Sequence, residues 1–328
     1  MNTSKIANRR IFVTASLVSV SGVGTYAFCV NQATITDPDK DGTSAVSANQ
    51  VTPERLVAWI TVQTRLTNAK PRRQRAVVLA EREFQQFMFG AIKGCGAFSK
   101  QMFSFGSKWK YLTYSKTEYQ KYLQRQFSKY VFSTSQLQNA ITNSIKTCIR
   151  ELDKIDNQLL ISIRQDLSNH ETLRIPSIKS QHSFTKHVND AALHYREIAN
   201  TELGLDVGGL VASEIATVIA FQIMRTVAIR MGVSSAILGA GAVGSTVTFG
   251  GALVAGVIVD FIVQSIIGVF WDAKGELTRQ IQQTLHKIDS EVRIGTKNSP
   301  GLRPRFTAIS NSSHKVLQNA LKDIILYS

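Results

Sequence analysis

SQLQNAITNSIKTCIRELDKIDNQLLISIRQDL, residues Ser135 to Leu167, is the stretch that decides the fold class of this chain. Its apolar side chains recur every three or four residues, at Leu137, Ile141, Ile145, Cys148, Leu152, Ile155, Leu159, Ile163 and Leu167. This spacing places them on one face of a continuous α-helix about 50 Å long. Such a helix needs a partner along its whole length, either another helix of this chain or a second copy. We expect a helix of the same chain, because other amphipathic segments are available.

Helix signals continue through most of the remaining sequence. Thr52-Pro53 combines a capping residue with a proline suited to the first turn, and predicts a helix over 54–66. Ser115 and Glu118 have the spacing of a capping box, which predicts a helix that ends near Val131. Further helices are predicted over 183–203, 272–293 and 305–326, with a turn-rich break at 295–301. We find neither an alternating strand pattern nor a repeat of fixed period, so the fold class is all-α.

The N-terminus has the layout of an export signal or a first membrane anchor. Lys5, Arg9 and Arg10 precede twenty uncharged residues, 11–30. The length permits a retained anchor, which we favour, whereas the small residues up to Ala27 leave a cleaved signal peptide as the alternative. In both cases the basic start predicts that residues 31–207 lie outside the cytoplasm, with the protein at the cell membrane.

A second apolar stretch, 231–271, is predicted to be a glycine-rich membrane hairpin. It has no charged residue before Asp260, and glycines at 250–251 offer a break near its middle. Small residues recur at four-residue spacing and would form one helix-packing face, at Ala236, Ala240, Gly244, Thr248, Ala252 and Gly256. The pattern resembles the glycine-zipper segments of membrane proteins, which implies close helix contact within the hairpin or between copies in a homo-oligomer.

Three charged residues in or near this stretch are candidate intramembrane charges: Glu214, Arg225 and Asp260. Charge at membrane depth is costly, so such residues would be paired or would face water. The alternative for Glu214 and Arg225 is an amphipathic helix that lies at the membrane surface or packs on the exported domain.

The charge balance favours anionic partners. The chain has 38 Lys and Arg against 23 Asp and Glu, a net charge of +15. Aromatic residues are interleaved with this charge over 65–129, a pattern that suits nucleic acid or a lipid interface. Export favours lipid headgroups or acidic envelope polymers, and we expect no nucleic acid. The competing interpretation is that the aromatic rings belong to the core and the charges to a solvated face.

Two residue patterns resemble ligand-binding motifs, one for a dinucleotide and one for a metal ion, but their surroundings in the sequence do not support either site. Gly239, Gly241 and Gly244 spell the glycine pattern of a dinucleotide site, but no alternation of strands and helices surrounds them. His187 and His194 would share a helix face with Asp190 and Glu197, yet seven residues rise about 10.5 Å, which is too far for one ion. We therefore predict no metal, no cofactor and no catalytic residue.

The three cysteines are too few for a disulfide-dense scaffold or a four-thiolate zinc site. Outside the cytoplasm, Cys95 and Cys148 could form a disulfide. As free buried thiols they would act as small apolar side chains.

These features predict five segments: a signal peptide or anchor at 1–30, a polar linker at 31–50, an extracytoplasmic helical domain at 51–207, apolar membrane-associated helices at 208–271 and a basic helical tail at 272–328. The function expected from them is that of a membrane-associated, non-enzymatic envelope protein that contacts the lipid bilayer. The main alternative is a membrane-perturbing or pore-forming protein whose hairpin is sheltered before it inserts. A nucleotide-binding enzyme using Gly239, Gly241 and Gly244 is a third interpretation.

Overall fold

The computed structural model describes residues 51–169, 175–202, 212–232, 247–267 and 274–327. These residues are almost entirely helical, which confirms the all-α prediction. The helices are α1 (Pro53–Met102), α2 (Phe105–Thr113), α3 (Lys116–Tyr130), α4 (Thr134–Ser168), α5 (Gln181–Glu202), α6 (Ala212–Arg230), α8 (Val247–Ile267), α9 (Lys274–Arg293) and α10 (Leu302–Leu326). A short 3-10 helix, Pro176–Lys179, precedes α5.

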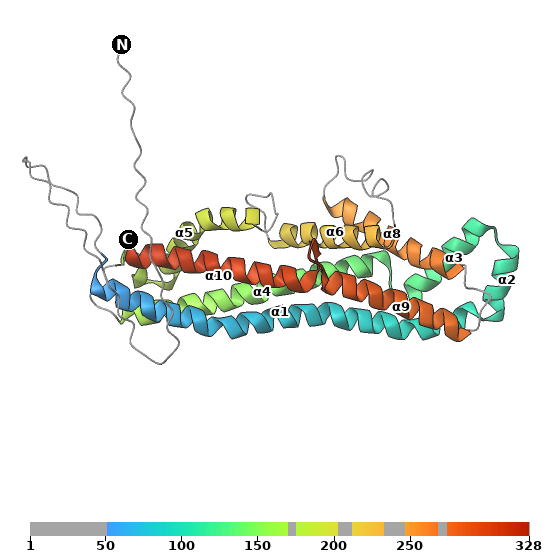
Figure 1. Ribbon diagram of the computed structural model, residues 1–328, viewed down its shortest axis with the longest axis horizontal. Helices are drawn as coiled ribbons and strands as arrows, with labels where there is room; N and C mark the ends of the chain where they lie inside the picture. The colour runs from blue at the N-terminus through green and yellow to red at the C-terminus, as the bar shows by residue number, and fades with distance from the viewer. Residues whose placement is uncertain (1–50, 170–174, 203–211, 233–246, 268–273, 328) are drawn as a thin grey trace, which may run out of the picture. The chain divides into compact units, whose positions relative to one another are not determined.

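Helix α4 confirms the prediction made from its apolar stripe. All nine stripe residues are buried, and the helix begins at a capping box formed by Ser133 and Gln136. Its partner is α1 of the same chain, as expected, and Figure 1 shows the two helices side by side. They run antiparallel, because Arg65 pairs with Asp166 whereas the Ser144 hydroxyl donates to the Ala80 carbonyl further along.

Helix α1 is much longer than predicted, because it continues past Leu66 to Met102. Pro71 lies inside it on the exposed side. The buried face beyond Leu66 contains several alanines and the charged Arg73, so the sequence lacks the large aliphatic stripe that marks α4. On another side, α1 contacts α9 and α10 (Figure 1).

Helices α9 and α10 are joined by a tight turn that the sequence identified only as a break. Strands β1 (Gly295–Thr296) and β2 (Ser299–Pro300) pair in antiparallel register there, although no strand was expected. Gly295 has φ +66°, and a Cβ at this position would lie 2.3 Å from the backbone nitrogen of Gly301. The turn therefore requires glycine at position 295.

Residues 49–328 form one compact unit. The segments that the sequence separates near 207 and 271 therefore share a common core, because α6 and α8 pack on α4 and α9 and α10 pack on α1. No helix in the described ranges is long and apolar enough to span a bilayer.

Candidate functional site

The apolar helix α8 packs into the bundle along one face. Neighbouring helices α3, α4 and α6 contact it. The buried side chains recur at helical spacing, at Val254, Ala255, Ile258, Val259, Ile262 and Val263. Sequence alone places such residues in lipid or in a protein core, since both environments are apolar. In this structure other helices cover them.

The outer face of α8 mixes polar and apolar side chains, and Asp260 lies half-buried on it. Gln264 and Ser265 are exposed, and Phe261 is partly exposed beside them. Gly256 and Val257 lie half-buried on the same helix. The exposed Phe261 is the one large apolar side chain on this face among the described residues of α8.

Helix α6 contacts both α8 and α4, which also contact each other. Its buried side chains are small or aliphatic, at Ala216, Ile219, Ala220, Ile223, Met224, Val227 and Ala228. The predicted intramembrane charges Glu214 and Arg225 are exposed on this helix. In this packed arrangement both side chains lie on the solvent-facing side of α6, and their position relative to a membrane stays a prediction.

Two polar contacts tie α6 and α8 to other helices. Gln124 of α3 donates a hydrogen bond to the carboxylate of Asp260, the acidic residue at the end of the uncharged run. At the C-terminus of α6, the Arg230 guanidinium pairs with the Glu291 carboxylate of α9 and also donates to the Thr296 hydroxyl. Each contact links an apolar helix to a different neighbour, so together they specify where α6 and α8 sit.

The bundle against which α6 and α8 pack is itself fixed by buried charges. Glu81 of α1 is buried and accepts hydrogen bonds from Arg293 of α9 at 3.0 Å and from Arg303 of α10 at 2.7 Å. Two turns earlier in α1, the buried Arg73 pairs with Asp156 of α4. Burial, with the nearby Arg73 charge, lowers the pKa of His314. Because a buried charge is costly without a partner, these pairs favour one arrangement of α1, α4, α9 and α10.

The small-residue face is described only in part. Positions 236, 240 and 244 lie outside the described residues, as do the glycines at 239 and 241 of the nucleotide pattern. Thr248 and Ala252 belong to α8. At Gly256, an added Cβ would meet no heavy atom within 4 Å, so no backbone approaches closely at that position. The small-residue face as a whole stays a prediction.

Cys95 and Cys148 are free, buried thiols rather than a disulfide. Cys95 follows Gly94, which lies against Tyr130 near the C-terminal end of α1. Cys148 lies one turn after Ser144, which contacts Ala80 of α1. Because the helices are antiparallel, Cys148 is level with a part of α1 that precedes Ala80. The two levels are roughly 27 Å apart along α1, whereas a disulfide needs Cα atoms within about 7 Å. Burial raises the pKa of both thiols to about 12, so they act as small apolar side chains.

The interleaved aromatic residues divide between the two interpretations made from sequence. Phe84, Phe98, Phe127, Tyr119 and Tyr122 are buried, and several of these rings contact one another. By contrast, Phe89, Phe105, Trp109 and Tyr114 are exposed. Core packing therefore accounts for the first group only.

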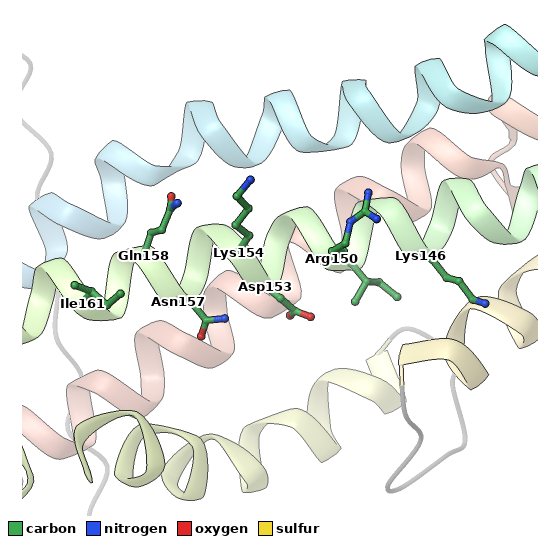
Figure 2. A pocket seen from close by; sticks show the side chains of 8 residues that line it. Lys146, Arg150, Asp153, Lys154, Asn157, Gln158 and Ile161 are labelled. Carbon is green, nitrogen blue, oxygen red and sulfur yellow. The ribbon is translucent and has the colours of Figure 1, made fainter. Parts of the chain in front are cut away.

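An open surface hollow on α4 shows no convergent binding groups. Figure 2 shows side chains from this one helix, and the hollow is lined by Lys146, Ile149, Arg150, Asp153, Lys154, Asn157, Gln158 and Ile161. The hollow lies on the solvent-facing side of α4, opposite the buried stripe. Among the described residues, no group of three or more His, Cys, Asp and Glu side chains could hold a metal ion.

Comparisons of the chain with protein-family models, with curated proteins and with solved structures give no match. The packing of α6 and α8 and the chemistry of their residues therefore carry the functional argument.

Proposed function

We propose that this chain is a non-enzymatic, membrane-associated protein that stores the apolar segment α6–α8 against its own helical bundle and releases it into a lipid bilayer. The observation that carries the proposal is the burial of α8 by α3, α4 and α6. Residues 231–259 contain no charge, so this part of the segment can exchange a protein environment for lipid without burying an ion. The charged residues on either side of it, Glu214, Arg225, Arg230 and Asp260, would stay in the headgroup region or in water.

The contacts that hold the segment suit a reversible arrangement. Gln124 with Asp260, and Arg230 with Glu291, are polar side-chain contacts between helices distant in sequence. Water can replace such contacts at limited cost, since the net free energy of a hydrogen bond to a charged group is about 1.5 to 3 kcal/mol. The apolar face then needs a new apolar environment, which a bilayer supplies.

The second candidate function is the permanent membrane anchor expected from the sequence. The observation that favours it is the exposed Phe261 on the outer face of α8. In both proposals residues 31–207 lie outside the cytoplasm. Since 49–328 is one compact unit, the packed form would place α6 and α8 on that same side. A reporter that works only in the cytoplasm can be fused after Gln50 to test this topology. Activity of that reporter would contradict it.

Leakage of a trapped dye from vesicles of phosphatidylglycerol and phosphatidylcholine tests the release proposal. The variant Phe261→Asp changes a side chain that is 37% exposed in the packed form, so the melting temperature should change little. Within a bilayer the same charge costs about 2.5 to 3.5 kcal/mol. We expect wild-type protein to cause leakage and Phe261→Asp to cause much less.

The matched control is Ile161→Asp, which places the same charge on the outer face of α4 at a residue 42% exposed. This variant should cause leakage like the wild type, because α4 stays outside the bilayer. Equal leakage from all three proteins would contradict insertion of α8. If the wild type causes no leakage and also stays in membranes after a carbonate wash, the permanent anchor is supported instead.

A further inference from the structure

Helix α2 has the reverse of the usual orientation for an amphipathic helix of a bundle. Its apolar side chains Phe105, Trp109 and Leu112 share one face, since they are spaced at i, i+4 and i+7. They are 84%, 59% and 72% exposed. An exposed apolar cluster of this kind usually marks an interaction surface.

The inward face of α2 is instead fixed by polar and ring contacts. The buried Ser107 hydroxyl donates to the Gln101 carbonyl at 2.7 Å, and lies 2.7 Å from the Tyr122 hydroxyl of α3. Tyr111, one turn further on, makes an edge contact with the Tyr119 ring at 5.1 Å between centroids. These contacts hold the apolar face outward, so its exposure is built into the structure.

The charges around α2 identify the chemistry of the partner. Residues 93–129 contain eight Lys or Arg and a single acid, Glu118. Glu118 accepts hydrogen bonds from Ser115 in the capping box that starts α3. Lys108 of α2 precedes Trp109 and is exposed, and the exposed Lys116 follows α2 at the start of α3. An apolar face with Trp and Phe, bordered by lysines, fits a bilayer surface that carries anionic headgroups.

We propose that the outward face of α2, formed by Phe105, Trp109 and Leu112 and bordered by Lys108 and Lys116, is a docking site for anionic phospholipid. The helix lies in the headgroup region while its rings enter the edge of the acyl layer. Figure 1 shows α2 beyond the end of α1, connected to α3, whose residue Gln124 contacts Asp260. Docking needs no movement of α8, so it is separate from the release proposed above.

Flotation of the full chain with vesicles tests this site. We expect wild type to bind vesicles of phosphatidylglycerol and phosphatidylcholine, and to bind phosphatidylcholine alone much less. The double variant Phe105→Ser with Trp109→Ser should bind both kinds of vesicle at least about tenfold less tightly, because it loses both interfacial rings. The double variant Lys108→Gln with Lys116→Gln should lose about fivefold for each lysine, and only with the anionic vesicles.

Leu193→Ser is the matched control, because Leu193 of α5 is 61% exposed, close to the value for Trp109. It should bind like wild type, and all variants should keep the wild-type melting temperature. Unchanged binding of both α2 variants would overturn the docking site. Loss of a dimer in the ring variant, with vesicle binding retained, would also overturn it and identify a second copy as the occupant.

Dye leakage measured in the same samples separates the two proposals. Binding that depends on α2, without leakage from any protein, would support the docking site and contradict the release of α8. If the α2 variants bind vesicles like wild type and still cause leakage, docking through α2 is overturned. The release of α8 would then still be supported.

Discussion

Arg73 and Asp156 form the most deeply buried ion pair between α1 and α4. Their side chains are 3% and 17% exposed. The Arg73 guanidinium also donates to the Ser310 carbonyl at 3.0 Å, and the Ser313 hydroxyl donates to Asp156 at 2.9 Å. The pair therefore links α1, α4 and α10 at one level, where an unpaired charge would be costly.

We expect Asp156→Ala to lower the free energy of unfolding by about 3 to 5 kcal/mol, because it leaves the Arg73 charge buried without its partner. Asp166→Ala is the matched control between the same two helices. Its partner Arg65 is 48% exposed, so the loss should stay below about 1 kcal/mol. Urea unfolding measures both, and similar losses would contradict the different burial of the two pairs.

Gly94 of α1 marks the closest approach between α1 and the α3–α4 connection. A Cβ there would lie 1.9 Å from the carbonyl oxygen of Tyr130, a backbone atom that cannot rotate away. We expect Gly94→Ala to destabilise the protein by at least about 1 to 3 kcal/mol. Gly90→Ala should stabilise it by about 0.5 to 1 kcal/mol, because its Cβ meets nothing within 4 Å in the same helix.

Thermal and urea unfolding of both alanine variants provide the check. A wild-type melting temperature for Gly94→Ala would mean that the two backbones are further apart than the structure has them.

Local residue patterns could be predicted, whereas the contacts that hold α8 could not. Ser115 and Glu118 are three residues apart, so their spacing alone identifies the capping box. Gln124 and Asp260 are 136 residues apart, and Arg230 and Glu291 are 61 apart. Nothing in a single sequence indicates which distant polar residues will meet.

At the scale of elements, periodicity succeeded where the buried face is large and aliphatic. It predicted α4 to within a residue at each end and its partner within the chain. It failed for most of α1, where alanines and Arg73 replace large aliphatic residues on the buried face. For α8 the predicted break at Gly250 and Gly251 is wrong, because the helix continues through both glycines from Val247 to Ile267. The sequence also did not give the surroundings of α8, because lipid and protein cores select the same residue types.

The α4 stripe predicts opposite results for two isoleucines of one helix. Ile145 is fully buried, so Ile145→Ala should cost about 2 to 5 kcal/mol. Ile161 lies on the exposed side of the same helix, and Ile161→Ala should change stability by less than about 0.5 kcal/mol. Chemical denaturation distinguishes them, and an unchanged midpoint for Ile145→Ala would show that the stripe is not the core.

At the scale of the whole molecule, the account joins two apolar features with different roles. The face of α2 is exposed in the packed form, and in our proposal it is the part that docks on a bilayer. The face of α8 is covered by α3, α4 and α6 and contacts lipid only after those helices separate from it. Helix α3 follows α2 and contacts α8, so docking and release involve neighbouring elements.

The most direct test of release is to lock α8 to α3. In a Cys29→Ser background, Gln124→Cys and Asp260→Cys place one thiol on each side of the contact. A short bis-maleimide with a reducible disulfide spacer then joins them, while the buried Cys95 and Cys148 stay unreactive. The control is the same linkage through Arg65→Cys and Asp166→Cys, which joins α1 to α4.

The measurement is dye leakage from vesicles of phosphatidylglycerol and phosphatidylcholine. The account predicts that the lock at 124 and 260 abolishes leakage, that reduction of the spacer restores it, and that the α1–α4 link has no effect. Equal leakage from the locked and the reduced protein would contradict it, because α8 would then act on membranes without leaving the bundle.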